Sequence, residues 1–307
     1  MELIRGLHNI QPKHRGCVLT IGNFDGVHLG HQAVLSQVQA IARQLELPAV
    51  VMVFEPQPLE LFNPAAAPAR LSRFREKYHW LARLGLERLL CAGFTKEFAS
   101  QEPQQFIEQL LLQKLGVRHL IVGDDFCFGK NRAGNYALLQ QAAAHYGFGL
   151  SNTASLKQDD LRVSSTLIRQ ALEHNDLALA SQMLGRPFSL MGRVRHGEKV
   201  GRQLGFPTAN VWLYRNKLPV RGVFAIEAAT AQGHFYGVAN IGARPTLQGK
   251  QEQLEAHFFD FQGDLYGQQI EVTLRHKIRS ERKFASLAEL QQQIQLDAAA
   301  ARHYFSK

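Results

Sequence analysis

The hydrophobic pattern of this 307-residue chain changes its period once, near residue 185. Before that point, short runs rich in β-branched residues alternate with helical segments whose apolar residues recur every three or four positions. The runs are CVLTI, AVVMVF, RLLCAGF and RHLIVG, and the helical segments span residues 31–45, 74–84 and 103–115. This alternation predicts an open parallel sheet wrapped by helices, of the Rossmann-like α/β class. Such sheets bind ligands outside the carboxyl ends of their strands, so we expect the chemistry in the loops after Ile21, Phe54 and Val122.

The second half of the chain has the shorter period of β-strands. Its strand-like pieces are FSLMGRVRH, GVFAIEAAT, HFYGVANIG, EAHFFDF and QIEVTLRH, with turns rich in Gly, Pro and Asp between them. They predict a small antiparallel β-barrel. A covering helix is expected over 286–305, where Ser286 and Glu289 form a capping box ahead of an apolar face. The change of period alone sets the predicted domains at 1–184 and 185–307.

The composition predicts a cytoplasmic protein that does not bind membranes. With 45% hydrophobic residues the chain can bury a core, yet no apolar run approaches the roughly 18 residues that would span a bilayer. The amino-terminal residues MELIRGLHNI lack the apolar core of a secretory signal. Cys17, Cys91 and Cys127 lie far apart without a CxxC pair, so we expect reduced thiols and neither a disulfide framework nor a structural zinc site.

The net charge of +9 favours anionic partners, which include nucleotides, nucleic acid and acidic lipid. Lys and Arg are scattered and form no basic block, so a solvated basic surface explains most of them. We therefore expect small anionic substrates and do not expect nucleic acid.

The stretch TIGNFDGVHLGHQ places two histidines where a strand gives way to a helix. The strand ends at Ile21, glycines allow a tight path, and the helix begins around His28 to Gly30. His28 and His31 then project to one side of a helix start, whose N–H groups and dipole already favour an anion. A zinc site is the alternative, but zinc normally takes at least three protein ligands and no third is visible nearby. Two partly exposed loop histidines are the plain alternative.

At this point the residues carry a resemblance. His28-Leu29-Gly30-His31 matches the H-x-G-H motif of the nucleotidyltransferase superfamily, which includes class I aminoacyl-tRNA synthetases. The longer strings GNFDGVHLGHQ, VFEPQPLELF, VGDDFCFGKNRAGN and VSSTLIR resemble the prokaryotic bifunctional riboflavin kinase/FMN adenylyltransferases, also called FAD synthetases. The resemblance runs essentially from end to end.

The resemblance implies an adenylyl transfer in the first domain. A phosphate of FMN would attack the α-phosphate of ATP and pyrophosphate would leave, so the protein aligns anions and supplies no nucleophile. His28 and His31 would contact the ATP phosphates, with Ser164, Ser165, Thr166 and Arg169 opposite them. Further nucleotide contacts are implied for Gly22, Phe24, Asp25 and Gly30. A plain Ser/Thr helix cap followed by a solvated arginine is the commoner meaning of VSSTLIR.

The string VGDDFCFGKNRAGN is not a Walker A loop. Five residues separate Gly123 from Gly129 where that motif has four, and Asn131 replaces the Ser or Thr that would hold magnesium. The resemblance implies a loop of the flavin and nucleotide pocket, with Asp125 and Phe126 as flavin contacts. Cys127 departs from the arginine more often expected there.

A second site is predicted in GRVRHGEKVGRQLGFPTAN, residues 192–210. Gly197, Gly201 and Gly205 permit a loop whose N–H groups could wrap phosphates, and Thr208 and Asn210 offer neutral oxygens suited to Mg²⁺ beside a nucleotide. A Gly-rich β-connection is the alternative. The resemblance identifies PTAN as the riboflavin kinase motif.

A kinase that acts on a hydroxyl also needs a proton acceptor, and one carboxylate suffices because the phosphoryl transition state is loose. The resemblance implies Glu255, which spacing alone does not separate from Glu252 or Asp260. In a strand, Glu255 and His257 share a face, so a solvent-facing polar row of an edge strand is the alternative. Within RSERKF, Arg279 and Phe284 resemble the flavin side of a closing loop.

Together these features predict two enzymes in series, one making FMN from riboflavin and ATP and the other making FAD from FMN and ATP, both with Mg²⁺. The alternatives are a nucleotidyltransferase with another acceptor and a flavin- or RNA-binding protein that has lost catalysis. A class I synthetase fits less well, because no KMSKS-like loop is present. The sequence predicts neither an oligomeric state nor transfer of FMN between sites without release.

Overall fold

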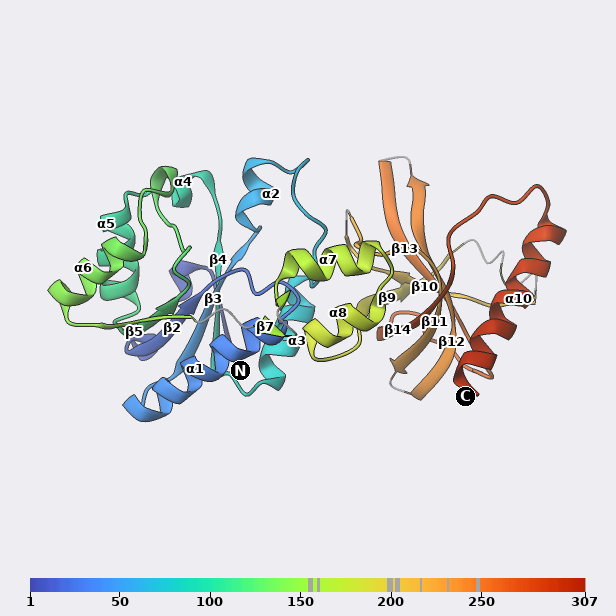
Figure 1. The fold of residues 1–307 in the computed structure, drawn as a ribbon, viewed down its shortest axis with the longest axis horizontal. Coiled ribbons are helices and arrows are strands. Elements are labelled where there is room, and N and C mark those ends of the chain that lie inside the picture. The colour runs from blue at the N-terminus through green and yellow to red at the C-terminus, as the bar shows by residue number, and fades with distance from the viewer. Residues whose placement is uncertain are drawn as a thin grey trace. The chain divides into compact units, whose positions relative to one another are not determined.

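The structure is a computed structural model that describes residues 1–307 except 154–156, 159–160, 198–200, 202–204, 216, 231, 247–248 and 307. The chain forms two compact units (Figure 1). The first unit comprises Met1–Pro68 and Phe74–Val163, and the second comprises Ala69–Arg73 and Ser164–Lys307. The predicted domain limits at 184 and 185 stay a prediction.

Six parallel strands form the sheet of the first unit in the order β1-β4-β3-β2-β5-β6. They are β1 (Glu2–Arg5), β2 (Cys17–Ile21), β3 (Ala49–Glu55), β4 (Arg88–Gly93), β5 (Val117–Val122) and β6 (Gly149–Asn152). The predicted Rossmann-like sheet is confirmed, and β2 to β5 are the four predicted strands. Strand β2 lies between β3 and β5, so the three loops singled out from the sequence meet at one edge of the sheet, at its topological switch point.

Helices cover both faces of this sheet. They are α1 (Leu29–Leu45), α2 (Pro58–Phe62), α3 (Phe74–Arg83), α4 (Lys96–Ala99), α5 (Pro103–Gln105) and α6 (Tyr136–Tyr146). Successive strand residues point to opposite faces, so Leu19 packs with Ile107 and Leu111 while Val18 packs with Leu35 and Leu81. Short elements complete this unit: the 3₁₀ turns Leu7–Asn9, Pro12–His14 and Lys130–Arg132, and the strands β7 (Lys157–Gln158) and β8 (Leu161–Arg162).

The helix predicted over 103–115 is helical but differently wound. After α5 it continues as a π-helix over Phe106–Lys114, and Leu115 N donates to Leu110 O at 3.0 Å. The leucine face expected from the spacing is still buried, with Leu111 at 0% and Leu115 at 1% exposed. Burial of the apolar face therefore fits a helix here. The apolar spacing of three and four residues does not distinguish an α-helix from a π-helix.

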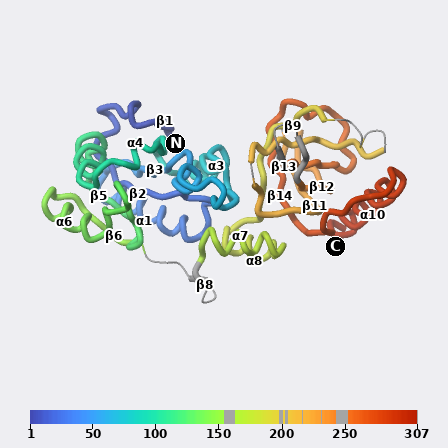
Figure 2. The backbone as a smooth tube through the Cα atoms, turned by 90° about the horizontal axis from the view of Figure 1, so that it is seen from above, coloured from blue at the N-terminus to red at the C-terminus, as the bar shows by residue number. Residues whose placement is uncertain are grey.

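The second unit contains a closed antiparallel barrel of order β10-β13-β12-β11-β14-β9. Helices α7 (Ser165–Glu173) and α8 (Leu177–Leu184) precede β9 (Ser189–Arg195), β10 (Ala209–Trp212), β11 (Gly222–Thr230), β12 (Gly233–Thr246), β13 (Gly249–Phe258) and β14 (Gln269–Arg279). The predicted barrel is confirmed, and β10, which contains part of PTAN, was not among the predicted strands. Figure 2 shows these strands closing into a ring.

The carboxyl-terminal helix α10 (Leu287–Phe305) covers the outside of the barrel, as predicted. Ala298 and Ala301 pack against Val223 and Val238 of β11 and β12. Ser286 caps the helix by accepting a hydrogen bond from Glu289 N at 3.2 Å. In a capping box the Glu289 carboxylate would accept from the N–H of the N-cap residue, Ser286. Here it accepts from the N–H of Ala285, one residue earlier, so only the serine half of the expected box is formed.

Candidate functional sites

The first site is the helix start at His28 and His31. Strand β2 ends at Ile21, and His28 is the N-cap of α1, with its Nδ1 accepting from His31 N at 3.3 Å. That bond leaves the ring proton of His28 on Nε2, which can then donate to a ligand. The two imidazoles stack with their centroids 3.6 Å apart. The structure therefore places both histidines on one side of the helix start, as the spacing predicts.

Glycine inside the H-x-G-H motif leaves room for the His28 ring. A Cβ at Gly30 would lie 3.1 Å from two ring atoms of His28. The preceding loop is tight as well, since Phe24, Gly26 and Val27 all have positive φ, and a Cβ at Gly22 would lie 3.2 Å from the Phe24 ring. Asp25 is 3% exposed in the same loop. These contacts fix the path of the loop between β2 and α1.

The environment of His31 favours a neutral ring. Burial lowers the pKa of His31 well below its ordinary value, and the charges of His28 and Lys77 lower it further. The Nδ1 atom of His31 is shielded from solvent and has no hydrogen-bond partner among the described residues. A neutral imidazole with unused hydrogen-bonding capacity suits contact with a phosphate oxygen.

A lysine that the sequence patterns did not single out lies near this site. Lys77 of α3 is 0% exposed, and its Nζ lies 3.8 Å from Glu55 Oε1 at the end of β3. A buried cation at the carboxyl edge of the sheet adds positive charge beside the histidines. The signal was present, because Lys77 lies three residues after Phe74 and four before Leu81, on the apolar face of the helix.

The loop after β5 carries Asp125 and Phe126. Asp125 is exposed, and a Cβ at Gly123 would lie 2.7 Å from its Oδ1. Phe126 is half-buried and stacks on Phe128 with centroids 5.6 Å apart. Cys127 donates its S–H to Asp125 O. The structure thus brings this loop to the edge of the sheet where β2 and β3 also end.

The residues Ser164 to Arg169 belong to the second unit. Ser164 is the N-cap of α7 and accepts from Leu167 N at 3.3 Å, so the helix-cap interpretation is confirmed for Ser164. Ser165 and Thr166 occupy the first turn of α7. Arg169 is half-buried, and its Nε donates to Ala69 O at 2.6 Å. The interpretation of Arg169 as a solvated side chain is therefore wrong.

The second site is a cavity of about 210 Å³ between the outer face of the barrel and α10. Five of the predicted residues line it: Gly201, Thr208, Glu255, Arg279 and Phe284. The remaining lining residues come from the barrel, from the segment after β14 and from α10: Phe206, Val223, Val238, Ala239, Asn240, His257, Glu281, Arg282, Leu290, Ile294 and Asp297. Residues far apart in the sequence thus line one cavity.

The structure separates the three carboxylates that the sequence left equivalent. Glu252 is 4% exposed and pairs with Arg221, while Asp260 is exposed and pairs with Arg302. Glu255 alone of the three lines the cavity. Strand β13 is paired on both sides, so the alternative of an edge strand is wrong for Glu255 and His257.

Asn210 lies beside Glu255 in the barrel. The two residues are directly opposite each other in β10 and β13, and Asn240 of β12 is opposite Glu255 on its other side. Gln253 Nε2 donates to Asn210 Oδ1. Gly197 packs against the Asn210 side chain, since a Cβ there would lie 2.3 Å from its Nδ2.

The glycines around 201 allow the chain to fold over Thr208. A Cβ at Gly201 would lie 2.4 Å from Phe206 O, and Gly205 has a φ of 84°. Parts of the predicted phosphate loop, 198–200 and 202–204, lie outside the described residues. Thr208 also lines a second cavity of about 230 Å³, with Pro207, Tyr266 and Asp264 in its wall. The two cavities therefore meet at Thr208.

Two family models match the chain. One described as FAD synthetase matches residues 10–167, and one described as riboflavin kinase matches residues 184–305. Each match includes the residues that form one of the two sites, apart from Arg169, which lies two residues beyond the first.

Curated relatives match over the whole length. The bifunctional riboflavin kinase/FMN adenylyltransferase of Escherichia coli (strain K12) is 52% identical over 307 residues, which are 99% of this chain and 98% of the relative. The protein of the same description from Haemophilus influenzae is 48% identical, with all of both chains covered. That of Pseudomonas fluorescens is 48% identical, with 98% of this chain and 97% of the relative covered.

Among solved structures, a chain named as a macrolide-efflux protein from Streptococcus pneumoniae matches with a TM-score of 0.81 and 28% identity. The match covers 98% of this chain and 99% of that one. In the part of this chain that the structure describes, no helix has both the length and the apolar character needed to cross a membrane.

Proposed function

The chain belongs to the bifunctional riboflavin kinase/FMN adenylyltransferase family, and we propose that each of its two sites carries one of the two reactions. The protein phosphorylates riboflavin with ATP to give FMN, and it transfers an adenylyl group from ATP to FMN to give FAD and pyrophosphate. The helix start at His28 would serve the second reaction and the barrel cavity the first.

In the adenylyl transfer, His28 and His31 would bind the phosphates of ATP. A phosphate oxygen of FMN attacks the α-phosphorus, the bond to the leaving pyrophosphate breaks, and negative charge grows on the oxygens between them. The proton of His28 Nε2, the N–H groups of the helix start and the buried cation of Lys77 would stabilise that charge. The stacked ring pair supports this role, because it holds both imidazoles in one orientation before the nucleotide arrives.

The other assigned contacts of this reaction follow the same logic. Gly22, Phe24, Asp25 and Gly30 would shape the nucleotide side of the loop, and Ser164, Ser165, Thr166 and Arg169 would add donors from the start of α7. Asp125 and Phe126 would contact the flavin, and the stacked Phe126 and Phe128 rings offer an aromatic surface for it.

In the kinase reaction, Glu255 would accept the proton of the terminal hydroxyl of riboflavin. The hydroxyl oxygen then bonds to the γ-phosphorus of ATP as the bond to ADP breaks. The carboxylate lines the cavity while Glu252 and Asp260 do not, and this single observation carries the assignment. The flavin would occupy the cavity under α10, with Phe284 and Arg279 in its wall, and Gly197, Gly201 and Gly205 would lie against the nucleotide.

The residues at the barrel site fit Mg²⁺. The Thr208 hydroxyl and the Asn210 amide oxygen are hard neutral donors, and Glu255 lies directly opposite Asn210. Bound magnesium would neutralise the phosphate chain of the nucleotide. Thr208 reaches both cavities, so a nucleotide in the second cavity would place its phosphates beside the flavin hydroxyl.

We further propose that the protein acts in the cytoplasm on small molecules, with 1–184 and 185–307 as its domains.

One experiment distinguishes the proposed function from both alternatives, which are a nucleotidyltransferase with another acceptor and a binding protein that has lost catalysis. Purified protein is incubated with riboflavin, ATP and Mg²⁺, and FMN, FAD and pyrophosphate are followed by chromatography. FMN should form first and FAD should follow with an equal amount of pyrophosphate. Binding of riboflavin without any FMN would contradict the kinase assignment.

A further inference from the structure

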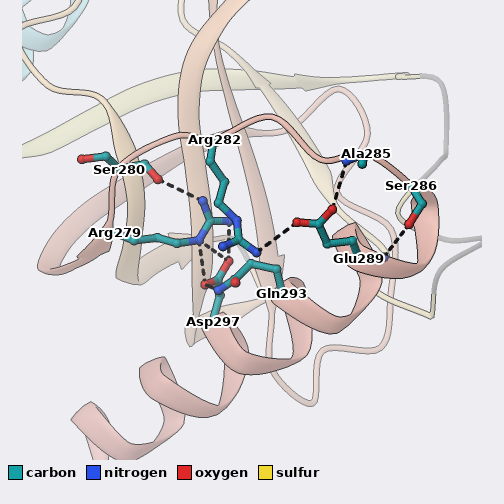
Figure 3. Close-up of polar contacts among 8 residues, drawn as sticks. All are labelled: Arg279, Ser280, Arg282, Ala285, Ser286, Glu289, Gln293 and Asp297. Atoms are coloured by element: carbon teal, nitrogen blue, oxygen red, sulfur yellow. Dashed lines mark hydrogen bonds and ion pairs between the residues drawn. The ribbon is translucent and has the colours of Figure 1, made fainter.

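A charged cluster joins the end of β14 to α10 at the wall of the barrel cavity (Figure 3). Arg279 is the last residue of β14, and Asp297 lies in the middle of α10. Arg279 Nε donates to Asp297 Oδ1 at 2.9 Å, and Arg279 NH2 donates to Asp297 Oδ2 at 2.7 Å. The contact is bidentate, and Asp297 is only 4% exposed.

The remaining groups of this pair are also engaged. Gln293 Nε2 donates to Asp297 Oδ1 at 2.7 Å, and Arg279 NH1 donates to Ser280 O at 3.0 Å. All three nitrogens of the Arg279 guanidinium therefore donate to the protein itself. Arg279 is held in one orientation by α10, and its planar group is largely used by that contact.

The other end of the segment that follows β14 is fixed to the same helix. Glu289 accepts from Ala285 N at 3.0 Å, and its second oxygen lies 3.8 Å from Arg282 NH2. Glu289, Gln293 and Asp297 recur every four residues and so form one stripe of α10 that faces this segment (Figure 3). The segment 280–285 is thus tied to α10 before and after Phe284.

Phe284 is the aromatic wall that these ties hold. The Arg282 guanidinium carbon lies 4.7 Å from the ring centroid, and that of Arg279 lies 5.7 Å from it. Phe284, Arg282 and Asp297 all line the cavity. An aromatic side chain on an irregular segment would otherwise lose conformational freedom when a ligand binds, which weakens binding.

We propose that Asp297 is a positioning residue for riboflavin: by holding Arg279 it fixes the segment 280–285, so that Phe284 meets the isoalloxazine ring in a preformed wall. The proposal rests on the proposed function, in which riboflavin occupies this cavity. A buried ion pair is weak evidence for stability, because desolvation offsets much of its attraction. Holding the wall of the binding cavity in place is a role for the Arg279–Asp297 pair that does not depend on a contribution to stability.

The test is the variant Asp297→Asn in the full chain. The amide keeps the size of the side chain and loses its charge and one of its two acceptor oxygens. Riboflavin affinity, measured by quenching of riboflavin fluorescence without ATP, should fall about tenfold, which corresponds to 1.4 kcal/mol. The KM for riboflavin should rise in parallel while kcat stays within about threefold, because Asp297 does not touch the reacting atoms. Adenylylation of supplied FMN should be unchanged.

The matched control is Asp260→Asn. It removes the pair of Asp260 with Arg302, which also joins the barrel to α10, at 3.2 Å, but is solvent-exposed with side chains 83% and 53% accessible. Riboflavin affinity should stay within about twofold of wild type in this variant. A loss in Asp260→Asn equal to that in Asp297→Asn would show that any tether of α10 suffices, and would overturn the proposal.

Two further variants complete the test. Arg279→Gln is made alone and together with Asp297→Asn, which gives a double-mutant cycle. The double variant should bind riboflavin no more weakly than the weaker-binding of the two single variants. Arg279→Lys keeps the charge and loses the planar two-point contact, so it should still lower riboflavin affinity, and it decides the matter if Asp297→Asn does not fold. Unchanged affinity in a folded Asp297→Asn or Arg279→Lys protein overturns the proposal. Failure of the wild type to bind riboflavin would instead refute the proposed function.

Discussion

The site of the first unit is made mostly from one continuous strand, loop and helix, whereas the cavity of the second unit takes its walls from four strands, two loops and a terminal helix. His28 and His31 are neighbours in sequence and stack at 3.6 Å because the local backbone places them so. Thr208, Glu255 and Phe284 meet only because the barrel closes and α10 covers it. Both sites are expected to bind the phosphates of ATP.

The two sites should therefore be sensitive to different substitutions. A local site depends on a few backbone angles and on Gly30, which leaves space for the His28 ring. A site assembled from distant segments depends on every contact that holds those segments together, including contacts that never touch the substrate. Substitutions at the two sites should therefore separate the two activities, and changes outside the binding groups should affect the barrel site more.

The largest effect is expected for Glu255→Gln. Loss of the proton acceptor should lower FMN formation by roughly 10²- to 10⁴-fold, while supplied FMN is still converted to FAD. Rates of the two steps are measured separately, with riboflavin or with FMN as the starting flavin. Asp260→Asn is the control, because its carboxylate is outside the cavity. A kinase rate in Glu255→Gln equal to that of wild type would remove Glu255 as the base.

The next effect is expected for His31→Ala. Removing one preorganised donor at developing phosphate charge should lower FAD formation by about 10²- to 10³-fold and leave FMN synthesis unchanged. His145→Ala, at an exposed position of α6, is the matched control. Equal loss of both activities in His31→Ala would contradict the separation of the two sites.

The local or distant origin of a feature decides whether the sequence predicts it. The strands β2 to β5 and the histidine pair follow from local patterns, because a buried strand, a glycine and a helix start leave their marks within a dozen residues. Strand β10 was missed, since Thr208 and Asn210 follow a proline and glycines that indicate a loop. The hydrogen bonds from Arg279 to Asp297 join residues 18 positions apart, one at the end of a strand and the other in a helix. No periodic spacing in the sequence predicts such a contact.

The residues that the sequence left equivalent differ in their burial. Glu252, Glu255 and Asp260 are chemically similar, and only closure of the barrel sends the first inward, the second to the cavity and the third to solvent. Lys77 shows the opposite case. Its position on an apolar helix face was visible, but a lysine there is read as solvated until the tertiary structure shows it buried.

Lower pH should destabilise the first unit before the second. The native pKa of His31 is lowered by burial and by His28 and Lys77, whereas the unfolded ring keeps a pKa of about 6.5. Below that value the unfolded state binds a proton that the native state does not, so stability present above pH 6.5 is lost as the pH falls. The loss should grow as the pH falls from 6.5 toward 5. In the second unit the pKa values of Asp260 and Lys277 are lowered, but their ordinary values of 3.8 and 10.5 lie outside this window.

The measurement uses the two tryptophans, Trp80 in the first unit and Trp212 in the second. Urea unfolding of Trp212→Phe, followed by Trp80 fluorescence at pH 7.5 and pH 5, reports the first unit. His31→Gln should remove most of the difference between the two pH values. His119, whose pKa burial also lowers, is retained in both proteins and contributes equally. A pH effect that persists in full in His31→Gln would assign it to other groups.

The smallest effects compare two serines that cap helices with nearly the same geometry. Ser164 accepts from Leu167 N at 3.3 Å and Ser286 accepts from Glu289 N at 3.2 Å. Replacement of either by Ala should cost about 1 kcal/mol of unfolding free energy, measured by urea titration, and replacement by Gly only a few tenths.

If Ser164 also contacts the nucleotide, Ser164→Ala should in addition lower FAD formation by about tenfold, the value of one hydrogen bond to a charged group. Ser286→Ala should change stability without that loss. Equal FAD formation in the two variants would mean that Ser164 only caps α7.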